Sequence, residues 1–367
     1  YWFDDKIGAW VTSDFYMKTL PDWVTEYNKT NRPDAYLAKP WTTLLPIEQY
    51  TESIADDNNF ETILKGETRP VFPHDLPELH KKYGITIIRQ TPFGNDYTAD
   101  FAKAAIKNYA LGSDDVTDFL CLSFSSTDIV GHAYAPQSVE VEDTYLRLDQ
   151  TMADFLTYLD TNVGKNNYTL FLTADHGGVE NTGYLKSLNM PSNLFDVKVL
   201  KKDLQAFLVE TYKDSLLSDD VNLQIYLNDT KLKINHLDKK SVCETVAEWL
   251  RNREGINTVF TREELLNGTS GETLFANIKR GFLAMRSGDV AYTLLPSWGD
   301  WGLLGTSHGM AYPYDTHVPL LWYGKNIKHG SSSAETHVTD IAATLAQLLN
   351  IQMPSGCFAQ PILPLLH

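Results

Sequence analysis

The alternation of strand and helix patterns in the middle of the chain constrains the fold more than any other feature. Residues 118–125 (DFLCLSFS) form a nearly continuous apolar run, typical of a strand buried on both faces of a sheet. Residues 140–163 carry apolar side chains at steps of three and four, which indicates a long amphipathic helix. Residues 168–174 (YTLFLTA) repeat the buried-strand pattern. Two strands joined by such a helix lie parallel and adjacent, so the sequence predicts an α/β fold whose central, mostly parallel sheet has helices on both faces.

Further elements extend this pattern on both sides. The sequence before residue 84 is rich in Pro, Trp and Tyr with weak periodicity, which predicts long surface connections and short helices, one of them near residues 20–29. Four more elements are expected: a strand at 84–88, a helix at 98–110 capped by Thr98, a strand at 317–323 and a capped helix at 339–349.

Between about residues 180 and 295 the regular alternation stops, and we interpret this stretch as an inserted, cap-like region. Its expected elements are helices at 202–216 and 241–253, a hairpin of 221–228 with 231–236, a helix that begins with a Thr261–Glu264 capping box, and a strand at 289–295. We therefore expect a single domain, residues 1–367, interrupted by an insertion at 180–295.

The charge balance limits the possible partners. The chain has 31 Lys and Arg against 47 Asp and Glu, a net charge of −16, which argues against binding to nucleic-acid polymers or to a membrane surface. An acidic chain that acts on an anionic substrate must build a local positive centre, and bound metal ions are the most compact way to do so. No apolar run of about 18 residues occurs, so no transmembrane helix is expected.

The cysteines and the first residues add two expectations. Cys121, Cys243 and Cys357 are too few for a disulfide scaffold and lack CxxC spacing; Cys121 is expected to be buried, and Cys243 could pair with Cys357. Residues 1–5 (YWFDD) lack Met and the features of a signal peptide. We interpret the chain as a processed product or as part of a longer protein.

Three short segments, each expected at the edge of the sheet, contain residues of the types that bind metals. In residues 125–132, Asp128 and His132 are four apart and can converge on one ion, although such pairs also occur by chance. In residues 173–178, Asp175 and His176 stand on an expected tight turn; the alternative is a helix-capping Asp beside a surface His. His308 lies between small residues in a loop and, taken alone, is equally an ordinary loop histidine.

Together these segments are more specific than any one of them. Side chains that follow the strands of a parallel sheet meet at one edge of it. Two carboxylates and three imidazoles exceed the needs of one structural zinc and suit two ions that share a substrate oxygen. The sequence therefore predicts a two-metal site.

The order of these motifs resembles the alkaline phosphatase superfamily. D-x-x-x-H at 128–132 is followed by T-A-D-H-G at 173–177 and by S-H-G at 307–309, and residues 318–320 and 340–345 also fit. Three further stretches are similar to the phosphate-irrepressible bacterial alkaline phosphatases, which are close to the nucleotide pyrophosphatase/phosphodiesterase branch: residues 72–77, 125–132 and 140–148.

The resemblance implies an alkaline phosphatase-like fold and a division of the ligands between two Zn²⁺ ions. Asp128, His132 and His308 would hold the first ion, and Asp175 and His176 would contribute to the second. Members of the family add a Thr nucleophile, an Asn near it and, in the monoesterases, a Lys-x-Arg phosphate clamp. No match to these is found here, and in the family they precede the position of Tyr1.

The activity implied is hydrolysis of small-molecule phosphate monoesters through a phospho-threonine intermediate, by an exported (periplasmic or secreted) enzyme. Two alternatives stay open: a phosphodiesterase or nucleotide pyrophosphatase on the same metals, and a non-catalytic metal-binding chain if residues 1–367 were the whole protein. The residues also leave open whether Trp298 and Trp301 line a substrate cleft or pack between the insertion and the sheet, and Arg147 with Asp149 is expected to form a surface ion pair.

Overall fold

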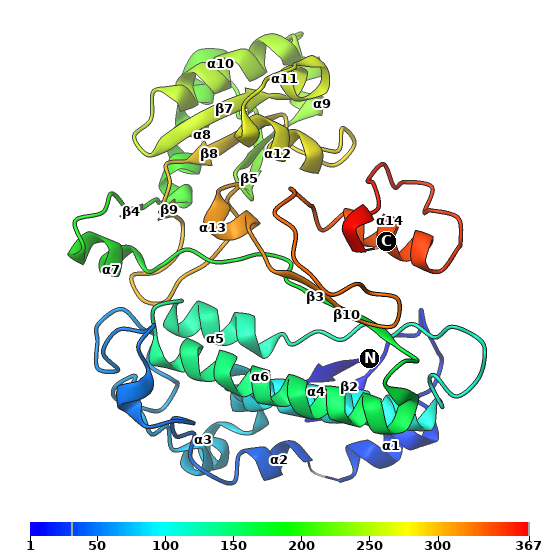
Figure 1. Ribbon diagram of the computed structural model, residues 1–367. Helices are drawn as coiled ribbons and strands as arrows, with labels where there is room; N and C mark the ends of the chain where they lie inside the picture. Colours follow the sequence, from blue (N-terminus) through cyan, green and yellow to red (C-terminus); the bar gives the residue numbers. More distant parts are fainter. Residues whose placement is uncertain (31, 366–367) are drawn as a thin grey trace. The chain divides into compact units, whose positions relative to one another are not determined.

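The computed structural model describes residues 1–30 and 32–365 and divides into two compact units (Figure 1). Unit 1 comprises residues 1–175 and 318–367, and unit 2 comprises residues 176–317. No helix in the described part of the chain is long and apolar enough to cross a membrane.

Three helices build the main layer of unit 1: α4 (Phe93–Asn108), α5 (Ser126–Tyr134) and α6 (Val139–Leu159). Helix α6 packs against both of the others (Figure 1). It begins where the hydroxyl oxygen of Ser138 accepts a hydrogen bond from the backbone N–H of Val141 at 3.1 Å, a cap of the kind that stabilises a helix by about 1 kcal/mol. A single π-helical turn, η3 (Asp160–Gly164), continues it.

The buried carboxylate of Asp143 on α6 anchors the loop of residues 41–50. It accepts hydrogen bonds from the indole N–H of Trp41 at 2.7 Å and the backbone N–H of Leu44 at 2.7 Å. Arg147, one turn further on, donates its Nε–H to the same carboxylate at 2.6 Å. The predicted surface pair of Arg147 with Asp149 is therefore wrong, because Asp143 at i−4 lies on the same helix face and is already desolvated.

An aromatic core packs the N-terminal residues onto α4. Strands β1 (Trp2–Asp4) and β2 (Ala9–Val11) form an antiparallel hairpin, and Trp10 of β2 stacks on Phe101 with ring centroids 4.0 Å apart. Asn28 at the end of α1 (Asp22–Asn28) makes hydrogen bonds to both the N–H and the carbonyl of Trp10. These contacts show that the N-terminal region contributes to the core, not only to surface connections.

The remaining elements of unit 1 are short. Strand β3 (Thr169–Thr173) pairs antiparallel with β10 (Leu320–Gly324), with Thr173 opposite Leu320. The other elements are α2 (Arg32–Tyr36), η1 (Ile47–Gln49), α3 (Leu76–Tyr83), η2 (Ile85–Gln90), α14 (Asp340–Leu348) and η4 (Leu363–Leu365).

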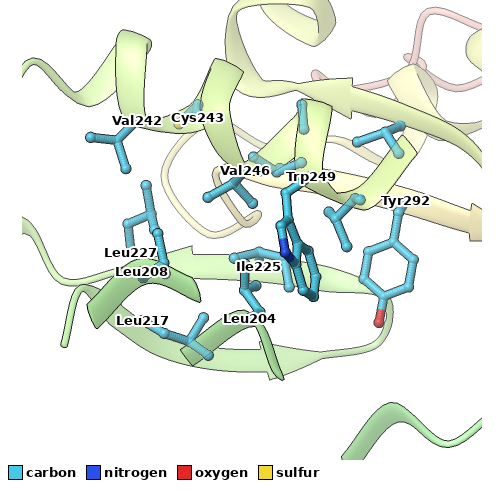
Figure 2. Close-up of a cluster of buried hydrophobic side chains, with 14 of the residues drawn as sticks. Leu204, Leu208, Leu217, Ile225, Leu227, Val242, Cys243, Val246, Trp249 and Tyr292 are labelled. Atoms are coloured by element: carbon cyan, nitrogen blue, oxygen red, sulfur yellow. The ribbon is translucent and has the colours of Figure 1, made fainter. Parts of the chain in front are cut away.

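Unit 2 is built on a four-stranded antiparallel sheet in the order β5 (Leu217–Val221), β6 (Gln224–Leu227), β8 (Val290–Leu294), β7 (Ile256–Thr261). Helix α8 (Val197–Tyr212) packs against β5, and α10 (Lys239–Arg251) packs against β7 and β8. Figure 2 shows side chains of both helices, Leu204 and Val246 among them, in one apolar cluster with those of the sheet. Burial of such a side chain contributes about 1.5–3 kcal/mol.

Shorter elements complete unit 2. Strands β4 (Asn193–Leu194) and β9 (Trp298–Gly299) form a small parallel pair. The other elements are α7 (Thr182–Ser187), α9 (Asp229–Ile234), α11 (Arg262–Asn267), α12 (Thr273–Gly281) and α13 (Pro313–Thr316). The boundaries of the predicted insertion, 180–295, lie inside this unit.

The α/β class is confirmed, but the sheets are mixed and not mostly parallel. Among the named strands of the described chain, only β4 and β9 pair in parallel. Residues 118–125 form no strand, so the predicted βαβ unit with β3 is absent from the described residues. Leu122 and Phe124 pack beside α4 and α6, whereas Phe119 and Leu120 are 60% and 41% exposed. The apolar side chains of this stretch explain its contact with the helices, but apolar composition alone does not supply a strand with which to pair.

Three other predictions in unit 1 are corrected. Residues 84–88 lie at a helical turn, η2, because Gly84 at φ 76° redirects the chain and Ile87 with Ile88 enters the core. Helix α4 begins at Phe93, so Thr98 lies inside it and donates its hydroxyl to the carbonyl of Gly94. Cys121 was expected to be buried and is exposed, and all three cysteines are free thiols.

In unit 2, the predicted hairpin is shifted along the chain. Strands β5 and β6 pair across Asn222 and Leu223, both with positive φ, the geometry of a two-residue hairpin turn. Residues 231–236 are not a strand, because Asn228 accepts a hydrogen bond from the N–H of Lys231 and begins α9. The Thr261–Glu264 capping box is confirmed.

A buried histidine in unit 1 lies between two glutamates. His74 has no exposed surface; its Nδ1 lies 2.8 Å from Glu67 Oε2, and its Nε2 lies 3.2 Å from Glu140 Oε1. Burial lowers the pKa of His74, but the contacts with Glu140 and Glu67 outweigh it and raise the pKa to about 9. Burial, with the nearby charge of Glu140, raises the pKa of the Glu61 carboxyl well above its usual range.

These shifts predict that the free energy of unfolding falls as the pH is raised. The stabilisation from His74 is fully present below pH 6.5 and is lost through about pH 9, and it amounts to on the order of 3 kcal/mol. The protonated Glu61 acts in the same direction, because the unfolded chain releases its proton at lower pH. Urea unfolding from pH 6 to about pH 10 measures the slope.

His74→Gln should flatten this slope, while His329→Gln, at an exposed histidine, should leave it unchanged. An unaltered slope in His74→Gln would contradict the assignment.

Candidate metal centre

In unit 1, helix α5 presents the first predicted ligand pair. Asp128 and His132 are one turn apart on one face, with Asp128 Oδ1 3.4 Å from His132 Nε2. Their side chains are 44% and 37% exposed, so both are accessible to an ion. The start of α5 is fixed against α4, because Asn95 Nδ2 donates to the hydroxyl of Thr127 at 3.0 Å and a Cβ on Gly94 would clash with Ser126.

Asp175 is also in unit 1, two residues after the end of β3. Its side chain is exposed, at a bend of the chain. The chain therefore bends at Asp175, just beyond the end of β3, and residues 176–178 form no assigned turn.

In unit 2, the structure brings His176 and His308 together from distant parts of the sequence. Their imidazole rings are stacked face to face, with centroids 3.3 Å apart and planes inclined by 13°. His176 Nδ1 lies 2.8 Å from the carbonyl oxygen of Gly177, so Nδ1–H is the donor there and Nε2 is the nitrogen that carries the lone pair of the neutral ring. Residue spacing does not predict this stack.

The two loops that carry these histidines are joined by buried hydrogen bonds. Asn181 Nδ2 donates to the carbonyls of Leu303 at 3.0 Å and Gly305 at 2.7 Å. The hydroxyl of Thr306 donates to the carbonyl of Val179. Because loop backbone buried from water needs such partners, these two side chains set the spacing of the loops.

A buried carboxylate, Asp315, is a residue that sequence reasoning missed. It lies on α13, and its Oδ2 accepts hydrogen bonds from the two residues that follow His308. An acid seven residues after a ligand histidine, in a helical turn that begins with Pro313, was the available signal. The structure shows it as the point where the two histidine loops meet.

The two tryptophans considered for a substrate cleft pack within unit 2. Trp298 contacts the apolar cluster of the sheet, and its ring fills the space beside Gly255. Trp301 donates its indole N–H to the hydroxyl of Thr182 at 3.1 Å. Both contacts support the packing interpretation.

Comparison with known proteins identifies the family of the chain. Residues 7–298 match the model of the family described as type I phosphodiesterase / nucleotide pyrophosphatase. The chain belongs to this family. The predicted resemblance to the alkaline phosphatase superfamily is thereby confirmed.

Curated relatives align with nearly the whole chain. Alkaline phosphatase PafA of Elizabethkingia meningoseptica is 40% identical over 366 residues, which are 99% of this chain and 66% of the relative. Alkaline phosphatase PhoV of Synechococcus elongatus is 38% identical over 366 residues, 100% of this chain and 66% of the relative. A protein of Myroides odoratus named calcium-transporting ATPase is 42% identical over 99% of this chain and 67% of its own length. The chain thus spans about two thirds of the length of these relatives.

A solved structure has the same fold. The crystal structure of wild-type alkaline phosphatase PafA matches with a TM-score of 0.94 and 39% identity, covering 100% of this chain and 70% of that one. The alkaline phosphatase-like fold predicted from the motifs is confirmed.

Proposed function

We propose that this chain forms the metal-binding part of a phosphate ester hydrolase that uses two zinc ions. Asp128, His132 and His308 would hold one ion, and Asp175 with His176 would contribute to the second. The observation that carries the proposal is the ring-on-ring contact of His176 with His308, residues that no sequence-local effect would bring together. Membership of the phosphodiesterase family supports it.

The donor set fits zinc. Carboxylate oxygens and imidazole nitrogens are the ligands that Zn²⁺ takes in catalytic sites, and the side chains of Asp128 and His132 are open to an incoming ligand. When bound, zinc polarises phosphoryl oxygens and lowers the pKa of a coordinated hydroxyl group or water. The role of the chain's own residues is to hold the ions, whose positive charge would locally offset the net charge of −16 that otherwise repels an anionic substrate.

The proposed reaction proceeds through a phospho-threonine, as the resemblance implies, and the activity is a property of the whole protein. None of the motifs in residues 1–367 supplies the Thr nucleophile or the Lys-x-Arg clamp. The proposed location is periplasmic or secreted, since bacterial alkaline phosphatases are typically exported; phosphatase activity that stays in the cytoplasmic fraction of the source cells would contradict this.

Phosphate monoesters are the proposed substrates, because two of the relatives are named alkaline phosphatases. We expect the whole protein to give a higher kcat/KM for p-nitrophenyl phosphate than for bis-p-nitrophenyl phosphate. Faster turnover of the diester would favour the alternative, a phosphodiesterase or nucleotide pyrophosphatase, which the family description also names.

Removal of one ligand should empty one metal position. We expect Asp128→Ala and His308→Ala to lower the zinc content, measured by mass spectrometry after dialysis, from two ions per chain to one. Activity should fall at least about 100-fold, since even outer-shell changes cost 10- to 100-fold. His329→Ala, at an exposed histidine, is the matched control. Two retained zinc ions in both ligand variants would show that the assignment is wrong.

A further inference from the structure

The loops that carry His176 and His308 are both hydrogen-bonded to one residue, Asp315. We propose that Asp315 is a positioning residue that fixes the relative placement of the two histidine ligands and thereby sets the affinity of the centre for zinc. The inference rests on the proposed function, and it goes beyond it by assigning the alignment of two ligands to a side chain that binds no metal itself.

The side chain of Asp315 controls the loop after His308. Asp315 is 3% exposed, and its Oδ2 accepts hydrogen bonds from the N–H of Gly309 at 2.9 Å and of Met310 at 2.7 Å. Gly309 has φ 118°, a conformation that suits glycine, so the chain turns sharply next to the ligand. The two N–H groups that donate to this one buried carboxylate oxygen hold the turn in place.

The main chain of Asp315 controls the loop after His176. Its carbonyl oxygen accepts a hydrogen bond from the N–H of Gly177 at 2.7 Å. A Cβ at Gly177 would lie 2.2 Å from the carbonyl oxygen of Tyr314, so a side chain there would force the two segments apart. The residues adjoining both histidine ligands are therefore bonded to the same residue.

This arrangement accounts for the close stack of the two imidazoles. A ligand on a loop binds a metal well only when its neighbours hold it within a fraction of an ångström of the productive position. Asp315 also lies near enough to both rings for its charge to act on them, and its Oδ1 is buried without a hydrogen-bond partner in the described part of the chain. Outer groups that hold ligand histidines in place contribute about 10- to 100-fold to metal affinity.

The test is the zinc dissociation constant of the whole protein, measured by competition with a chelator. We expect Asp315→Ala to weaken zinc binding about 10- to 100-fold, and saturating zinc to restore much of its phosphatase activity. Asp315→Asn keeps one side-chain carbonyl oxygen as acceptor, so it should weaken zinc binding less than Asp315→Ala does. Gly177→Ala should weaken binding independently, through the clash with Tyr314.

Asp220→Asn is the matched control. Asp220 is another buried aspartate of unit 2, and it accepts hydrogen bonds from the hydroxyl of Tyr292. This variant should lose stability but keep the zinc affinity of the wild type, which separates positioning from general destabilisation.

The outcomes distinguish a failure of the proposed function from a failure of the role proposed for Asp315. Wild-type protein that binds no zinc would overturn the proposed function. Wild-type protein that binds two ions, with an unchanged affinity in Asp315→Ala, would overturn only the role of Asp315. If Asp315→Ala fails to fold, the affinities of Asp315→Asn and Gly177→Ala decide, and wild-type values in both would reject the inference.

Discussion

The hydrogen bonds that join the loops of residues 177–182 and 303–310 are the interaction on which the histidine pair depends. These loops are irregular, so their N–H and carbonyl groups find no partners in a helix or a strand ladder. Asn181 and Asp315 supply those partners from buried positions. The short helix α13 is thus a structural support for the ligands.

Elements whose signals are local were predicted well from the sequence. Helix α6 begins within one residue of its predicted start, and a π-helical turn continues it to Gly164. Helix α10 lies within two residues of its predicted bounds, and the capping box at Thr261 forms as expected. Elements that depend on a distant partner were not predicted well. Residues 118–125 have the composition of a strand, but strand formation needs a neighbouring edge. Asn228 caps helix α9, so the second strand of the predicted hairpin does not form.

The candidate site divides in the same way. The contact of Asp128 with His132 follows from helical spacing alone, and all five ligand positions came from motif order and its resemblance to a family. The stack of His176 on His308 and the part played by Asp315 depend on how two loops fold together, which no residue spacing reports. Gly177 was noted as part of a motif, but its function, close approach of two backbones, appears only in three dimensions.

The unpaired apolar stretch in unit 1 has a consequence for how the chain behaves in concentrated solution. Residues 119–127 carry no charge, and Phe119, Leu120 and Cys121 are exposed in a stretch that forms no helix or strand. Such a segment is a template for intermolecular β-pairing and amyloid-like association. Asp114, Asp115 and Asp118 stand directly before it, and their like charges oppose the stacking of identical copies. We expect these three carboxylates to oppose self-association wherever this stretch is exposed.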